Sequence, residues 1–227
     1  MSWVLNLYRS AIGKKAVMAV TGLALFGFVL GHMAGNLKVY LGQEEYNHYA
    51  EWLRVAGSPL IPETGVLWIA RIFLLGAVAL HIHSATTLTL LSRAARPRRY
   101  EQLEVQTATY ASRTMRWGGV IIAFFVFYHL AHFTWGWAWA HPDFVAGDPY
   151  SNLVAGFSVV PIAVVYMVAN LVLGFHLYHG LWSLFQSLGW NHPRFNAWRR
   201  QFARVFAIVV TLGNLSFPIA VLTGVVS

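Results

Sequence analysis

Seven of the ten histidines lie inside long apolar stretches of the sequence, where an ionisable side chain is costly and usually has a function. Imidazole can bind a metal, exchange a proton or simply donate a hydrogen bond. One such histidine would be explained equally well by a hydrogen bond in a core. Seven histidines in four separate stretches instead indicate a functional set: His32, His81, His83, His129, His132, His176 and His179.

Three chemistries compete for these histidines. A non-haem di-metal site of the membrane desaturase type would need HxxxH and HxxHH clusters, and neither pattern occurs. A proton-relay transporter would need carboxylates at membrane depth, and no Asp or Glu lies inside an apolar stretch. Two b-type haems need four axial imidazoles, one from each of four helices, which the four histidine-bearing stretches can supply.

Within each histidine doublet, at most one ring can bind a given haem iron, because axial imidazoles approach from opposite faces. Positions three apart on a helix differ by about 60° around the axis and roughly 4.5 Å along it, and His81 and His83 differ by about 160°. Helical geometry alone leaves two choices open: His129 or His132, and His176 or His179.

The composition predicts an all-α integral membrane protein. Of the 227 residues, 57% are hydrophobic and 11% charged, and the mean hydropathy is +0.53. A membrane-spanning helix needs about 20 apolar residues. Five stretches of one domain (1–227) qualify: residues 16–40, 66–91, 117–139, 158–188 and 205–226. No cleavage site closes the first stretch, so it is expected to remain.

Charge predicts the orientation of the bundle. Basic residues gather in the N-terminal segment, in the loop between the second and third spans, and before the fifth span: Arg9, Lys14, Lys15, Arg93, Arg96, Arg98, Arg99, Arg113, Arg116, Arg194, Arg199, Arg200 and Arg204. The positive-inside rule makes this face and the N-terminus cytoplasmic, in a multi-pass protein of the cell inner membrane. Six acids fall on the outer face: Glu44, Glu45, Glu51, Glu63, Asp143 and Asp148. The basic face indicates contact with anionic lipid or an acidic protein, and no nucleic acid binding.

Smaller features complete the expected architecture. The segment EEYNHYAEWLRVAGSP predicts a short amphipathic helix on the outer interface, ended by Pro59 and Pro62. The three tryptophans between residues 135 and 139 are expected to form an outer aromatic belt. Glycines 27, 31 and 35 beside His32, with Gly136 and Gly180 further along, permit either a flat ligand or close helix packing.

Depth predicts which histidines meet. His32 lies roughly 26 Å along its helix from Lys15 and roughly 9 Å from Lys38, whereas His81 is roughly 18 Å from Arg93. His32 is therefore near the outer face and His81 nearer the inner half. Because successive spans alternate in direction, His32 should meet a histidine of the third span and His81 one of the fourth.

Four segments together resemble a known family. The order GKKAVMAVTGLALFGFVLGHMAGNL, LHIHSATTLTLLSRAARPRRY, FYHLAHFTWG and GFHLYHGLWSLFQSLGW is similar to the cytochrome b subunit of succinate:quinone oxidoreductase (complex II), of the single-subunit, five-helix, two-haem type. The resemblance covers nearly the whole chain. It implies that His32 and His129 ligate an outer haem b, and that His81 and His176 ligate an inner haem b.

The resemblance also implies a function and partners. A flavoprotein (FAD) subunit would oxidise succinate, and an iron–sulfur subunit on the cytoplasmic face would pass electrons through the two haems to quinone, expected to be menaquinone. This chain would do no dicarboxylate chemistry itself, and the lack of cysteine fits that division. A higher oligomer of the complex remains open.

Other residues receive secondary roles. Arg71, expected to be buried, is a candidate partner of an outer-haem propionate, and Glu63 and His132 are candidates for proton exchange with quinone. His83, His132 and His179 are expected to be packing, propionate or water partners. His48 and His141 are expected on the outer surface and His192 on the cytoplasmic side, with Ser92 and Trp190 near an alternative inner quinone site.

Three alternatives stay open. A fumarate reductase cytochrome b subunit has the same architecture, but some members place a buried acid just before the fourth-segment ligand, where this chain has Leu173 and Gly174. The cytochrome b of another quinone-linked dehydrogenase has a different histidine arrangement. A histidine-lined transporter is disfavoured by the missing carboxylates.

Overall fold

The computed structural model describes the backbone of residues 2–95 and 110–227, and the side chains of residues 6–95 and 114–227. Four basic residues of the loop between the second and third spans were predicted to mark the cytoplasmic face. Their side chains lie outside the described residues: Arg96, Arg98, Arg99 and Arg113.

The described part of the chain consists of helices joined by turns and short irregular connections. Its helices are α1 (Ser2–Arg9), α2 (Ala11–Asn36), η1 (Leu37–Leu41), α3 (Gln43–Val55), α4 (Gly65–Ala94), α5 (Tyr110–Phe133), α6 (Pro149–Ser158), α7 (Val160–Ser187) and α8 (Pro193–Leu222), of which η1 is a short 3-10 helix continuing α2. Five helical stretches are long and apolar enough to cross a membrane: α2 with η1, α4, the Thr114–Phe133 part of α5, α7 and α8. The prediction of an all-α bundle of five transmembrane helices is confirmed.

Capping residues explain where several elements begin or end. α8 begins at Pro193, earlier than expected from hydropathy, because the His192 side chain accepts a hydrogen bond from the Arg194 backbone N–H and a proline suits a first turn. α5 ends at Phe133, so the tryptophans expected in the third span lie in the turns that follow it. The outer helix α3 is present as expected but ends at Val55, ahead of both prolines.

α6 was not expected, although its signal is local. Asp148 caps it by accepting hydrogen bonds from the backbone N–H and the hydroxyl of Ser151, and Pro149 occupies the first turn. Asp148 also accepts hydrogen bonds from Gln43 and Asn47 of α3. The Ser151 hydroxyl is the main reason that the pKa of Asp148 is lowered, with smaller contributions from Asn47 and Gln43. Asp148 therefore ties the two short outer helices together.

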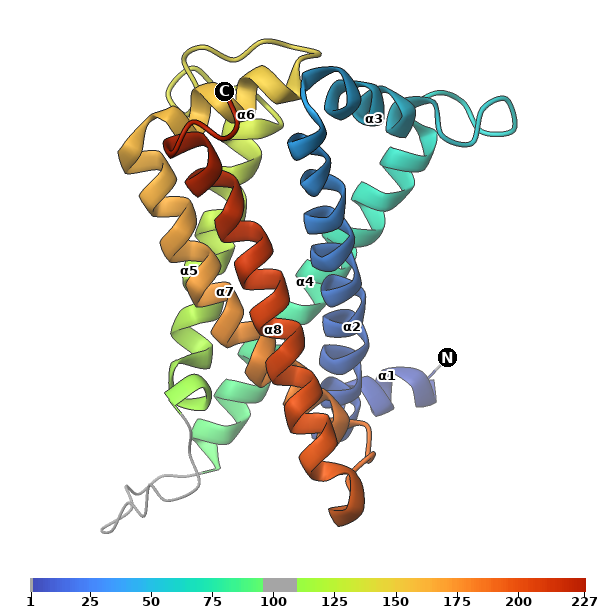
Figure 1. Cartoon of the computed structure of the whole chain (residues 1–227). Coiled ribbons are helices and arrows are strands. Elements are labelled where there is room, and N and C mark those ends of the chain that lie inside the picture. The colour runs from blue at the N-terminus through green and yellow to red at the C-terminus, as the bar shows by residue number, and fades with distance from the viewer. Residues whose placement is uncertain (1, 96–109) are drawn as a thin grey trace.

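The two ends of the bundle carry different elements. α3, α6 and the C-terminus lie at one end, and the N-terminus and the α7–α8 connection lie at the other (Figure 1). The first end holds the acidic residues of α3 and the α5–α6 connection. The second holds the described basic residues of α1, α2 and α8, with Arg93 in the last turn of α4 and Arg116 of α5. The structure therefore places the two charge groups at opposite ends.

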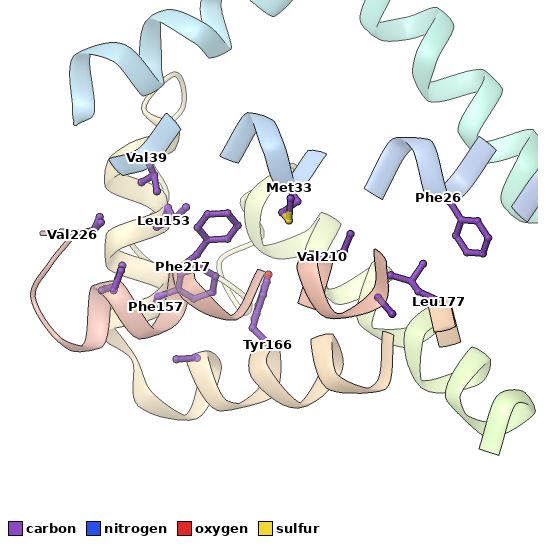
Figure 2. Close-up of a cluster of buried hydrophobic side chains, with 14 of the residues drawn as sticks. Phe26, Met33, Val39, Leu153, Phe157, Tyr166, Leu177, Val210, Phe217 and Val226 are labelled. Carbon is purple, nitrogen blue, oxygen red and sulfur yellow. The ribbon is translucent and has the colours of Figure 1, made fainter. Parts of the chain in front are cut away.

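The core lies between α2, α6, α7 and α8. Figure 2 shows Met33 of α2 near Tyr166 of α7 and Val210 of α8, with Phe26 of α2 further along the core near Leu177 of α7. Small residues permit the close approach: a Cβ on Gly213 would lie 2.2 Å from the Met33 sulfur. α4 packs mainly on α2, and α5 mainly on α7. Their most apolar stretches are only 6% buried, compared with 33% in α7 and α8, so α4 and α5 are attached at the edge of the core.

Candidate functional site

The outer pair of histidines joins α2 to α5. The rings of His32 and His129 have centroids 5.8 Å apart at an interplanar angle of 86°. The Asn36 amide nitrogen lies 3.3 Å from Nε2 of His32, and the Tyr46 hydroxyl donates to the Asn36 side-chain oxygen at 2.8 Å. Burial, with a smaller effect of Tyr49, raises the pKa of Tyr46 to about 12, so this hydroxyl keeps its proton at neutral pH.

Aromatic rings surround His129. The centroids of Phe125, Phe133 and Tyr166 lie 6.0, 5.8 and 5.9 Å from its ring. Its Nδ1 atom is buried without a hydrogen-bond partner. On the other side of the pair, Phe28 stacks on His32 at 5.4 Å. The outer pair therefore lies in a largely aromatic setting.

The inner pair joins α4 to α7. The rings of His81 and His176 have centroids 6.4 Å apart at 60°. Small residues border both rings: a Cβ on Gly22 would lie 3.4 Å from Cε1 of His81, and one on Gly119 would lie 3.6 Å from Cε1 of His176. Nδ1 of His81 lies 3.2 Å from the Thr21 hydroxyl. Nδ1 of His176 is buried without a hydrogen bond of normal geometry, although the Met115 backbone lies beside this ring.

Both pairs bridge helices that are not principal packing partners. α2 packs mainly with α4 and α5 with α7, yet the histidine contacts run from α2 to α5 and from α4 to α7. The histidine side chains therefore make these ring contacts between helices whose backbones contact each other little. This leaves the backbones at each pair further apart than in the small-residue contacts of the core.

The ring separations suit one metal ion between the members of each pair. Metal bonds to imidazole nitrogen are about 2 Å long, so two rings on opposite sides of one ion have centroids roughly 6 Å apart. The observed 5.8 and 6.4 Å agree with this value. A buried polar atom without a partner calls for an explanation, and either ring nitrogen of histidine can bind a metal. Within the described side chains, no group of three or more His, Asp or Glu could hold a metal, so the remaining ligands would have to come from a cofactor.

The second histidine of each doublet points elsewhere. His132 is fully buried. Its Nδ1 is hydrogen-bonded to the Tyr166 hydroxyl at 2.9 Å, and its ring centroid lies 4.7 Å from that of His141. His83 is exposed, and its Nδ1 lies 2.5 Å from the Tyr8 hydroxyl. His179 is half-buried, one helical turn beyond His176. In the structure, His129 contacts the ring of His32 and His176 contacts the ring of His81, so these two residues meet histidines of the spans expected from depth.

Three expectations about the outer residues were wrong. Arg71 is exposed and lies 5.0 Å from the Trp68 ring centroid, because α4 buries a different face against α2. His141 is 2% exposed, and its Nε2 lies 2.9 Å from the Asn152 carbonyl oxygen, because the connection after α5 folds back over the bundle. Gly136 lies in that connection with φ +58°, where a Cβ would overlap Phe144, so it serves a turn and not a ligand.

The other expected residues lie at or near the surface. Glu63 is exposed in the turn before α4, His48 is exposed on α3, and His192 is exposed at the start of α8. Ser92 and Trp190 are also exposed, at the basic end. The three glycines beside His32 differ in how much space they leave. A Cβ on Gly27 or Gly31 would meet no atom within 4 Å, whereas one on Gly35 would lie 2.7 Å from the Tyr49 hydroxyl.

Three residues with polar side chains that contact the paired histidines were missed from the sequence: Thr21, Asn36 and Tyr166. Asn36 could have been found, because it lies four residues after His32 on the same helix face. Thr21 and Tyr166 contact histidines of other helices, so no local spacing pointed to them.

Comparison with known families gives one result that bears on this geometry. A model described as "Succinate dehydrogenase/Fumarate reductase transmembrane subunit" matches residues 89–215, from the last turns of α4 through most of α8. This segment holds His129 and His176, one member of each pair. No curated protein and no solved structure matches the chain. The matched segment exceeds half of the 227 residues, and the chain belongs to the succinate dehydrogenase/fumarate reductase transmembrane subunit family, as a multi-pass membrane subunit of such a complex.

Proposed function

We propose that this subunit is a di-haem cytochrome b that carries electrons between the soluble subunits of the complex and quinone. His32 and His129 would hold the outer haem, and His81 and His176 the inner haem. The observation that carries the proposal is the pairing of four histidines from four helices into two facing pairs. Each b haem, when bound, supplies a carrier of one electron.

The protein's own part in this function is to hold and separate the two carriers. The aromatic rings of Phe125, Phe133 and Tyr166 pack around His129 of the outer pair, and the glycines beside His81 and His176 leave room for a flat group at the inner pair. No Asp or Glu occurs in the membrane-spanning stretches, so the apolar surroundings disfavour any other charge there.

The basic end is the proposed docking face for the iron–sulfur subunit, which would in turn bind the flavoprotein subunit. The first turns of α8 form a surface hollow of about 330 Å³ lined by Asn196, Ala197, Arg200, Gln201 and Arg204. The Arg200 guanidinium lies 5.0 Å from the Trp182 ring centroid, which anchors it to α7. With the positive-inside rule, this end faces the cytoplasm and the protein lies in the cell inner membrane.

Quinone, expected to be menaquinone, would react near the outer haem. Glu63 is exposed and could exchange protons with solvent there. His132 could act only through Tyr166 or His141, because its ring is fully enclosed. Arg71, exposed beside Trp68 in the second turn of α4, is the proposed partner of an outer-haem propionate.

Succinate oxidation is the proposed direction, with fumarate reduction as the second candidate. The resemblance places a buried acid of some fumarate reductases where this chain has Leu173 and Gly174. Gly174 packs so closely that a Cβ would lie 2.3 Å from the Thr211 hydroxyl, which leaves little room for a longer side chain. This contact favours the succinate-oxidising function.

The test is the haem content of the purified complex. We expect a reduced-minus-oxidised spectrum of the b type and about two haems per copy of this chain. Succinate should reduce these haems. The variant His48→Ala, on the exposed surface of α3, should keep both haems and serves as the control. Absence of haem from well-folded wild-type complex would overturn the proposal.

A further inference from the structure

The Thr21 hydroxyl has a defined donor role that constrains His81. Its proton is directed to backbone carbonyls of its own helix: Oγ1 lies 2.7 Å from the Val17 oxygen and 3.3 Å from the Met18 oxygen. A hydroxyl has one proton to donate and lone pairs with which to accept. Toward Nδ1 of His81, 3.2 Å away, Thr21 therefore acts as the acceptor.

This contact determines the tautomer of His81. If Thr21 accepts, Nδ1 carries the proton and Nε2 of the neutral ring is a bare lone pair. The Met18 carbonyl, which can only accept, lies beside the same ring and favours the same tautomer. Gly22, next in sequence, brings the ring close to α2, because a Cβ there would lie 3.4 Å from Cε1.

We propose that Thr21 positions His81 as a ligand of the inner haem. This proposal rests on the proposed function. It holds the Nδ1–H of His81 from α2, so that Nε2 is unprotonated before any ligand arrives. A hydrogen bond to the distal N–H of a metal-bound imidazole fixes its orientation and raises its basicity, and losing such a partner typically costs about 10- to 100-fold in metal affinity. Thr21 is buried, with 8% of its surface exposed, so water does not readily replace it.

The experiment compares Thr21→Val with Thr21→Ser in the whole purified complex. Valine keeps the shape and removes the hydroxyl, whereas serine keeps the hydroxyl. We expect Thr21→Val to weaken retention of the inner haem by about 10- to 100-fold and to change its midpoint potential and low-temperature EPR signal. Thr21→Ser should restore all three, and the outer haem should stay unchanged in both variants.

A matched control is Thr89→Val, which removes a membrane-depth hydroxyl that bonds to the Ala85 carbonyl of its own helix. It should change neither haem. An unchanged inner haem in Thr21→Val would mean that the Met18 carbonyl alone holds His81, and would overturn the role of Thr21. Equal loss in Thr21→Val and Thr21→Ser would overturn it too. Wild-type complex without haem would instead overturn the proposed function.

Discussion

The inner and outer histidine pairs are held in opposite ways. At the inner pair, Thr21 contacts Nδ1 of His81 and leaves Nε2 available. At the outer pair, Asn36 contacts Nε2 of His32, and Tyr46 holds Asn36 in place. At the inner pair, Nε2 of His81 would therefore be free for the proposed haem, whereas at the outer pair Asn36 would have to move if His32 is to bind through Nε2.

The surroundings of the two pairs differ in the same sense. The inner rings border Gly22 and Gly119, and the outer rings border Phe28, Phe125 and Tyr166. A group bound at the outer pair would therefore require side chains to rearrange, whereas at the inner pair the neighbouring positions are set by the backbones of α2 and α5.

The largest expected effect tests which ring of each doublet matters. His176→Ala should lose the inner haem and reduce the haem content from two to one per chain, because His176 is the ring that faces His81. His179→Ala should keep both haems. Haem extraction and optical spectra of the purified variants provide the measurement. The reverse result would refute His176 as the ligand, and with it the description of the inner pair as His81 and His176.

The next effect tests the open helix face beside His32. Nothing in the structure opposes a side chain at Gly31, so Gly31→Leu should leave the protein folded but displace a group bound there, with loss of most of the outer haem. Gly76→Leu is the matched control, since Gly76 on α4 is equally open. The measurement is haem content together with thermal unfolding. Two haems in Gly31→Leu would show that this face meets lipid.

The smallest effect tests the Tyr46–Asn36 bond. Tyr46→Phe should destabilise the protein by about 1 kcal/mol at pH 8, the usual value of one hydrogen bond. The pKa of Tyr46 is raised from 10.0 to about 12, so its contribution is full below pH 10 and is lost as pH rises from 10 through 12. Thermal unfolding at pH 8 and pH 11 should show the difference between the two proteins shrinking.

Tyr40→Phe is the control for this measurement, since it removes an exposed hydroxyl that donates to Ser216. If the difference in stability between wild type and Tyr46→Phe grew with pH, the raised pKa of Tyr46 and its role as a hydrogen-bond donor would be contradicted.

Much of the fold could be predicted because a bilayer constrains a sequence strongly. Length and hydropathy were enough to predict five spanning helices, since each helix must cross about 30 Å of hydrocarbon. Alternating direction and the rise per residue also predicted that His32 would meet the third span and His81 the fourth, and the ring contacts agree. α6 escaped because hydropathy does not separate a short outer helix from a loop, although Asp148 and Pro149 marked its start.

The sequence by itself therefore determined the membrane class, the number of spans, the segregation of charge and the depth of each histidine. These follow from position along the chain. Only the tertiary structure decided that His129 and His176 face partners, that His132 and His141 are enclosed, that Arg71 is exposed, and that Thr21 contacts His81. These depend on the rotation of each helix about its axis, which is set by the sum of many packing contacts between segments distant in sequence.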